Sequence, residues 1–299
     1  MKNQIKSIVL LGVLSALLIV LGGALAPGYL YLFTALALAM NLGAYFFSDR
    51  IVLALHRARE LAPHEAPELH GIVQELADRA RLPKPRVFLI PEAQPNAFAT
   101  GRNPQHAVVA VTEGILQILD RRELRGVLAH EIAHVKNRDI LISSIAAAIA
   151  SAVTSLAHAL SFASFFGGHS DDEESPGGGL LLALVAPIGA TLVQLGISRS
   201  REYLADETGA SLSADPEALA QALLKLERGA QLVPAAAAQP ATASLFIMNP
   251  LAGAGSLLSL FSTHPPVEER VRRLMMLAKG GRREVKDRHA DAPLWADRS

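Results

Sequence analysis

Four long apolar runs constrain the fold of this 299-residue chain more than any other feature of its sequence. They occupy residues 8–26, 29–47, 140–166 and 180–197. The first run has 19 residues without a charged side chain, close to the roughly 20 that a helix needs to cross a bilayer core. Hydrophobic residues make up 51% of the chain and charged residues 19%, which is unusual for a soluble enzyme. The runs therefore predict four membrane-spanning helices.

The positions of lysine and arginine support this interpretation. All 28 of these residues lie at positions 1–6, 50–138 or 199–299, and none lies in the acidic loop at 167–179. With four crossings, the three basic segments fall on one side of the membrane, which the positive-inside rule identifies as the cytoplasm. Two other interpretations stay open: a cleaved signal peptide for the first run, and a buried helical hairpin for the last two.

The polar parts of the chain predict a small sheet followed by a helix. Residues 56–81 have the pattern of a pair of amphipathic helices. Short strands are predicted at residues 86–90, 95–101 and 106–112. Residues 113–139 are helical in period, and Asp120 is placed to cap a helix that begins just after it.

The sequence HEIAH within this helical stretch raises the question of a metal site. His130 and His134 are four residues apart, so they share one helix face and can direct imidazole nitrogens at one ion. Glu131 lies beside that face and can reach a metal-bound water without being a ligand. The motif alone is not decisive, and a zinc site needs a third ligand further along the chain.

The best candidate for that ligand follows the fourth apolar run. Glu202 and Asp206 are again four apart on a predicted helix, which suits one carboxylate ligand and a second carboxylate that orients a ligating histidine. The alternative is a solvated helix face, with Arg199, Arg201 and Glu207 as its other members.

Composition narrows the partners and the chemistry of the metal. The net charge is zero, which gives no reason to expect binding to nucleic acid. The chain has no cysteine, so nitrogen and oxygen atoms must hold any zinc ion.

Four motifs together resemble the HtpX family of bacterial membrane zinc proteases, which is related to the CAAX prenyl proteases. They are NAFATG, HEIAH, SREYLAD and STHPPVEER, and the likeness runs from the N-terminal hairpin to about Lys279. The resemblance implies one zinc ion held by His130, His134 and Glu202, with Glu131 as the catalytic acid and base. It also implies an active site facing the cytoplasm at the bacterial inner membrane, and a role in stress response and in the quality control of membrane proteins.

The expected fold is mainly α with a small β-sheet: a zincin-like (gluzincin) cytoplasmic metalloprotease domain on a four-helix membrane anchor. The expected segments are a transmembrane hairpin (1–48), the first part of the protease domain with the HExxH helix (49–139), two further membrane helices with the acidic loop (140–198), the second part of the protease domain with the third ligand (199–279), and a polar tail (280–299). The expected partners are protein substrates, membrane proteins above all, and the lipid bilayer.

Two further roles are assigned with alternatives left open. The developing oxyanion needs a donor, for which His264 is the first choice and Arg270 the second; a packing role for His264 at its turn is the alternative. The residues Asn96, Ala97, Phe98 and Ala99 are expected to form an edge strand that pairs with the substrate backbone, or an ordinary structural strand.

Two rival classes of protein share some of these features. An inactive membrane scaffold would be expected to lose Glu131 or Glu202, and this chain keeps both. An iron oxygenase can use two histidines and one carboxylate as ligands, but a base beside the ligands favours hydrolysis.

Overall fold

The computed structural model describes residues 30–147, 199–233, 242–250 and 265–290, with residues 12 and 28. The predicted run at 180–197 and the acidic loop at 167–179 lie outside the described residues, as do the first run apart from residue 12 and the third run beyond residue 147. Within the described part, no helix combines the length and the apolar character that a membrane crossing requires. The four-helix anchor therefore stays a prediction.

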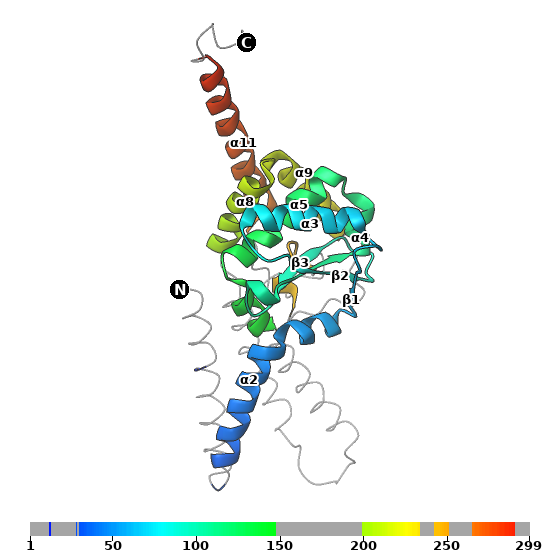
Figure 1. The fold of residues 1–299 in the computed structure, drawn as a ribbon, viewed down its shortest axis with the longest axis vertical. Helices are drawn as coiled ribbons and strands as arrows, with labels where there is room; N and C mark the ends of the chain where they lie inside the picture. The colour runs from blue at the N-terminus through cyan, green and yellow to red at the C-terminus, as the bar shows by residue number, and fades with distance from the viewer. Residues whose placement is uncertain are drawn as a thin grey trace, which may run out of the picture.

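The described chain is mainly helical with one small mixed sheet. Its helices include α2 (Leu30–Leu55), α3 (Pro67–Ala80), α4 (Glu113–Ile118), α5 (Arg121–Lys136), α8 (Arg199–Ser213), α9 (Pro216–Leu232) and α11 (Val267–Ala290), with short 3-10 turns η2 (Pro104–His106) and η3 (Ala243–Leu245). Residues 140–147 are helical as well. Its strands are β1 (Arg59–Glu60), β2 (Arg86–Ile90), β3 (Ala97–Thr100) and β4 (Val108–Thr112). Figure 1 shows α2 and α11 projecting from opposite ends of the body that the other elements form.

The sheet has the order β1-β2-β4-β3. β2 and β4 are parallel, whereas β1 and β3 run antiparallel to their neighbours. β3 is thus an edge strand of the sheet, and the pairing with substrate predicted for residues 96–99 stays a prediction. The strand at residues 86–90 is confirmed.

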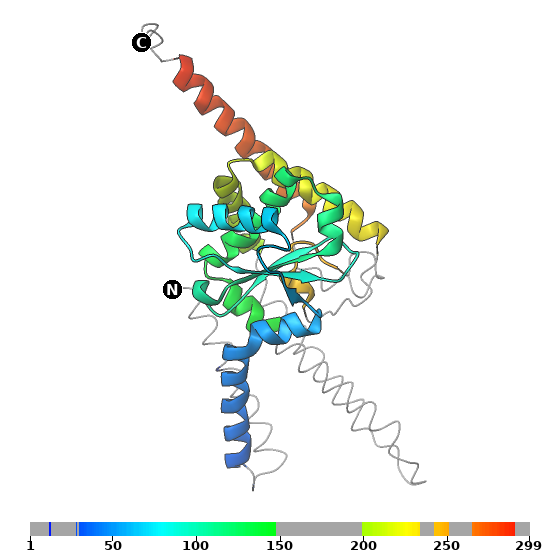
Figure 2. The same cartoon turned by 45° about the vertical axis from the view of Figure 1, so that its right-hand side comes forward.

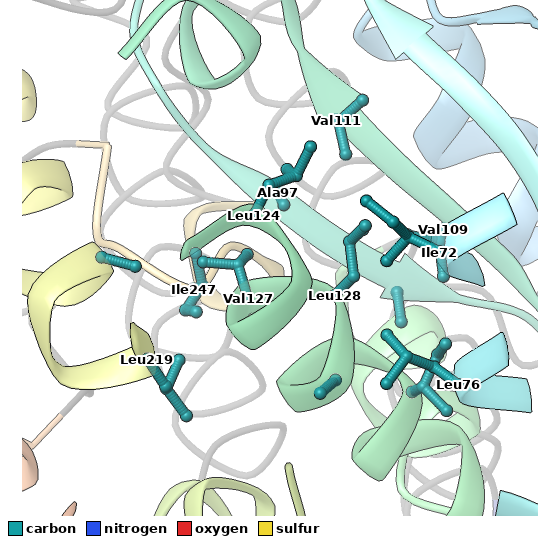
Figure 3. Close-up of a cluster of buried hydrophobic side chains, with 14 of the residues drawn as sticks. Ile72, Leu76, Ala97, Val109, Val111, Leu124, Val127, Leu128, Leu219 and Ile247 are labelled. Atoms are coloured by element: carbon teal, nitrogen blue, oxygen red, sulfur yellow. The ribbon is translucent and has the colours of Figure 1, made fainter. Parts of the chain in front are cut away.

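Both faces of the sheet are buried, because alternate side chains enter two different cores. On one face, Val109 and Val111 pack with residues of α3, α5 and α9, including Leu128 and Leu219 (Figure 3). On the other face, Phe88 and Phe98 pack with Val52 and Leu53 near the end of α2 and with Phe246. Figure 2 shows α3 and α5 on one side of the sheet and the end of α2 on the other.

The predicted helix pair at residues 56–81 is wrong in its first half. The chain leaves α2 after Leu55 and forms β1, which pairs with β2; the N–H of Leu61 also bonds to the carbonyl of Val87 at 2.9 Å. Helix α3 starts only at Pro67. A proline is tolerated at this first position, because an N–H there would have no partner within the helix. Residues 59–61, which the amphipathic pattern assigned to a helix, instead form their backbone hydrogen bonds with β2.

Two glycines let the helices around α5 approach closely. A Cβ atom on Gly209 of α8 would lie 2.9 Å from the Cα and N atoms of His130, and one on Gly126 of α5 would lie 2.9 Å from the N atom of Leu219 on α9. Real Cβ atoms are rarely so close to backbone, so these contacts require glycine. The contact at Gly209 sets the distance between the helices that carry the two candidate metal motifs.

We expect Gly209→Ala to lower the free energy of unfolding by about 1–3 kcal/mol, because the backbones of α5 and α8 must separate. It should also weaken metal retention. Gly71→Ala on α3 is the matched control, since no atom lies within 4 Å of its added Cβ, and there helix propensity predicts an unchanged or slightly higher stability. Denaturant unfolding and metal analysis of both purified variants measure the effect, and equal stability of the two would contradict the packing argument.

Candidate metal centre

The two histidines of the HEIAH motif face one point from helix α5. The helix begins with a capping box, in which the Asp120 side chain accepts from the N–H of Glu123 and the Glu123 side chain accepts from the N–H of Asp120. This cap, which the sequence predicted at Asp120, fixes the start of the helix. One turn apart, the Nε2 atoms of His130 and His134 lie 3.1 Å from each other.

Glu202 of α8 completes a group of three ligand atoms. Its Oε2 lies 3.7 Å from Nε2 of His130, and its Oε1 lies 3.7 Å from Nε2 of His134. One atom from each residue lies within 4.8 Å of the others. A tetrahedral ion bound at about 2.0–2.1 Å holds its ligand atoms about 3.3 Å apart. The three residues therefore fit a metal ion, and two imidazoles with a carboxylate are a donor set that suits zinc.

A buried ion pair lies behind His130. The Nδ1 atom of this fully buried histidine is 2.9 Å from Oδ1 of Asp206. Arg270 holds the same carboxylate through two donors, Nε at 2.8 Å and Nη2 at 2.7 Å. Burial by itself would raise the pKa of Asp206, but the Arg270 guanidinium and His130 lower it to about 2. Burial lowers the pKa of His130 and outweighs Asp206, so the imidazole stays neutral, as a metal ligand must be.

Arg270, the second choice for the oxyanion donor, is held by Asp206 behind His130. Besides Asp206, its guanidinium donates to the backbone carbonyl of Ile247 at 3.1 Å. The side chain is 1% exposed and lies at the Nδ1 side of His130, away from the Nε2 atom that faces His134. His264, the first choice for that donor, lies outside the described residues.

A second carboxylate, which the sequence interpretation missed, orients His134. Asp139 lies just beyond the end of α5, and both of its oxygens are 3.2 Å from Nδ1 of His134. Although burial opposes the charged imidazole, Asp139 and Glu202 raise the pKa of His134 to about 10. The sequence HVKNRD shows Asp139 five residues after His134. It does not show the turn after α5 that brings the Asp139 carboxylate back to Nδ1 of His134.

Glu131 is a buried carboxylate beside the three ligand atoms. Burial, with a contribution from the negative charge of Glu202, raises its pKa to about 8, while the backbone N–H of Ala99 that faces it acts in the opposite direction. Its Oε1 atom has no hydrogen-bond partner among the described residues. A carboxylate with such a pKa can both accept and return a proton near neutral pH.

These groups line one cavity at the edge of the sheet. Its lining residues are Ala99, Glu131, His134, Asp139, Ile140, Ser143, Arg201, Glu202, Ser244 and Leu245. The sequence placed Arg201 only on a solvated helix face, but its side chain is buried near Asp139 and Glu202. Burial lowers the pKa of the Arg201 guanidinium. The cavity therefore contains a carboxylate base, the ligand group and a cation in one place.

The predicted substrate strand reaches the cavity only at one end. Ala99 lines the cavity. The side-chain amide of Asn96 instead donates to the carbonyl of Met248, and the carbonyl of Ala97 accepts from the N–H of Ile247. Phe98 points into the second core and is fully buried.

Comparisons with known proteins identify the family of the chain. The family model "Peptidase family M48" matches residues 63–278. The protease HtpX homolog of Syntrophobacter fumaroxidans is 56% identical over 280 residues, covering 92% of this chain and 99% of that protein. The homolog of Ralstonia pickettii is 52% identical over 286 residues, covering 94% and 99%.

A solved structure shares the fold. The crystal structure of S. mikatae Ste24p superposes with a TM-score of 0.50 at 21% identity, covering 91% of this chain and 65% of that one. The fold and the group of metal-binding side chains, with these matches, define a metalloprotease. The chain belongs to peptidase family M48 and, within it, to the HtpX-type proteases.

We expect Arg270→Gln to destabilise the protein by about 3–5 kcal/mol, because it leaves the buried Asp206 carboxylate without its cation. Arg272→Gln removes an exposed partner of Glu269 and should leave the midpoint of denaturant unfolding nearly unchanged. The pKa of Asp206 is lowered from 3.8, so the stabilisation is complete above that value and is lost as the pH falls through about 2. Equal unfolding midpoints for the two variants would show that the buried pair is dispensable.

Proposed function

We propose that this protein is a zinc endopeptidase in which His130, His134 and Glu202 bind the ion and Glu131 is the general base and acid. The observation that supports this most directly is the meeting of three ligand atoms within 4.8 Å beside the buried Oε1 atom of Glu131.

The residues of the chain divide the work of peptide hydrolysis. A zinc ion held here supplies a Lewis acid that polarises the peptide carbonyl and lowers the pKa of water. Asp206 and Asp139 hold the Nδ1 atoms of His130 and His134, which keeps both Nε2 atoms directed at the ion. Glu131 takes a proton from the attacking water and gives it to the leaving amine.

The proposed substrate lies along the outer edge of β3. Main-chain pairing suits an enzyme that cuts varied sequences, because it does not depend on side chains. Ala99 is the residue of β3 that lines the cavity, and its N–H faces Glu131. We therefore assign the contact with substrate to Ala99, and we leave Asn96 and Ala97 to the pairing within the protein.

The proposed substrates are misfolded or damaged membrane proteins, cut at the cytoplasmic face of the bacterial inner membrane during stress. The four apolar runs and the charge distribution support a multi-pass protein, as does the resemblance to membrane proteases. Helix α2 supports a contact with lipid, because large apolar side chains are exposed along its length. They are Tyr31, Leu32, Leu38, Leu42, Phe46, Phe47 and Ile51.

The catalytic proposal predicts that two glutamate variants both lose proteolysis but differ in whether they keep the metal. Glu131→Gln should keep the metal but lose proteolysis by at least about 100-fold, because an amide cannot accept the proton from water. Glu202→Gln should lose the metal as well, because it removes a charged ligand. Glu207→Gln, on an exposed side chain of the same helix, is the control and should behave as wild type. Cleavage of a casein-like protein and metal analysis measure both properties, and turnover by Glu131→Gln near the wild-type rate would reject the assignment.

The membrane proposal predicts which single cysteines react from outside. In this cysteine-free chain, Ser170→Cys in the acidic loop should be labelled by an impermeant thiol reagent in cells with a permeable outer envelope. Lys84→Cys, at an exposed position of the catalytic domain, should be protected until the inner membrane is opened. Labelling of Lys84→Cys in intact cells would place the active site on the other side.

A further inference from the structure

Three aromatic residues follow one another on α2, near the end of its stretch of exposed apolar side chains. Tyr45 packs edge-on against Phe46, with the ring centroids 5.0 Å apart. Phe46 and Phe47 are nearly half exposed, at 45% and 49%. Aromatic side chains concentrate where the apolar core of a bilayer meets the headgroups. If α2 contacts lipid, as proposed above, these rings mark the level of the headgroups.

Two arginines lie over these rings. The central carbon of the Arg50 guanidinium is 5.6 Å from the centroid of the Phe47 ring. The Arg102 guanidinium, from the turn after β3, is 5.5 Å from the centroid of the Phe46 ring. Both distances are within the about 6 Å at which a ring face attracts a cation. We call Phe46, Phe47, Arg50 and Arg102 the arginine patch.

The turn after β3 fixes the position of Arg102. Its Nη2 atom donates to Nε2 of His106 at 2.6 Å, and Nδ1 of His106 in turn donates to Oδ1 of Asn103 at 2.7 Å. The turn begins at Gly101, whose φ of 135° favours glycine, and a Cβ atom there would clash with the carbonyl oxygen of His106. The guanidinium is therefore presented from a fixed turn, which lowers the entropy cost of binding a ligand.

The positive charge of the arginine patch is not balanced within the described part of the chain, where neither guanidinium is paired with a carboxylate. The acidic group next to Arg50 in sequence is engaged elsewhere, since Asp49 pairs with Arg86 at 3.6 Å. Arg59, a little further on, is paired with Glu65 at 2.7 Å. The arginine patch thus offers two cations to an external anion, beside exposed apolar rings.

The same turn connects the arginine patch to the cavity. The N–H of Gly101 donates to Oγ of Ser144 at 3.3 Å, and Oγ1 of Thr100 lies 2.7 Å from the same atom. Ser144 belongs to residues 140–147, the described start of the third apolar run. Strand β3 also contributes Ala99 to the cavity wall. The arginine patch is therefore joined both to the cavity and to a predicted membrane segment.

We propose that the arginine patch binds the phosphate groups of anionic phospholipids and so holds the catalytic domain on the cytoplasmic surface of the membrane. This inference rests on the proposed contact of α2 with lipid. The cytoplasmic leaflet carries anionic lipids, and a guanidinium can bind a phosphate through two parallel N–H donors. A bound headgroup keeps the cavity beside the bilayer, where segments of damaged membrane proteins emerge.

An acidic segment of another protein would also suit two arginines. The exposed rings favour lipid, because a phospholipid brings acyl chains to the apolar side chains of α2 together with a phosphate for the guanidinium groups.

Retention of lipid by the full-length protein tests the proposal. Protein is reconstituted into vesicles of equal parts phosphatidylglycerol and phosphatidylcholine and extracted again in a mild detergent, and the lipids that stay bound are counted by mass spectrometry. Wild type should retain phosphatidylglycerol over phosphatidylcholine by about tenfold, as two arginines at phosphates would give. The double variant Arg50→Gln/Arg102→Gln should retain the two lipids within about twofold of each other.

Two further variants separate the arginine patch from general effects of charge. Arg121→Gln/Arg272→Gln makes the same change of charge at exposed side chains. These residues lie on α5, across the sheet from the end of α2 (Figure 2), and on α11, at the opposite end of the molecule (Figure 1). This control should keep the preference of wild type. Arg50→Lys/Arg102→Lys keeps the charge and should keep a preference of at least about threefold.

Several outcomes would overturn the proposal. They are equal retention of the two lipids by wild type, an unchanged preference in Arg50→Gln/Arg102→Gln, and an equal loss in Arg121→Gln/Arg272→Gln. The same holds if fluorescent polyglutamate binds wild type and phosphatidylglycerol does not, since the partner would then be an acidic protein. Failure of wild type to enter vesicles of any composition would instead reject the membrane part of the proposed function, and this inference with it.

Cross-linking locates the lipid without any substitution. A photoreactive group on the headgroup of phosphatidylglycerol should label residues 46–50 and 101–106 of the wild-type protein, which mass spectrometry of its peptides would map. Labelling confined to other segments would overturn the proposal even if the arginine variants failed to fold.

Discussion

The close approach of α5 and α8 at Gly209 is the contact on which the rest of the site depends. With hydrogen in place of a side chain, the backbone of α8 can lie against the backbone of α5 at His130. Glu202 and Asp206 lie about two turns and one turn earlier on α8, and so reach opposite sides of the same imidazole. A wider separation between the helices would leave Glu202 short of the Nε2 atoms and Asp206 short of Nδ1. The spacing of two helices, set by one glycine, thus defines a three-residue ligand group.

Charge balance around this contact is divided between two regions. Behind His130, Asp206 and Arg270 neutralise each other out of contact with water, which makes the buried charges tolerable. In the cavity, the carboxylates of Asp139 and Glu202 raise the pKa of His134, so a divalent cation bound there would replace the proton that these charges favour on the imidazole.

The sequence predicted what depends on local spacing. HEIAH and SREYLAD each have a four-residue period, so their faces could be derived before any fold was known, and the strand at residues 86–90 had a clear apolar pattern. Contacts between distant parts of the chain were not predictable in this way. The residues next to Arg270 in the sequence do not indicate whether it binds an oxyanion or an aspartate. Only the fold places its Nη2 atom 2.7 Å from Oδ1 of Asp206. The bond between Ile247 and Ala97 joins residues far apart in sequence and leaves no pattern in either.

The sharing of the sheet between two cores has a consequence for how this enzyme can be divided. Val52 and Leu53, close to the end of α2, cover Phe88 and Phe98 on the face of the sheet opposite α5. A fragment that started after α2 would uncover an aromatic surface directly beneath the strand that lines the cavity. The end of helix α2 is therefore part of the catalytic domain, and proteolytic removal of this helix would destabilise the sheet beneath the cavity.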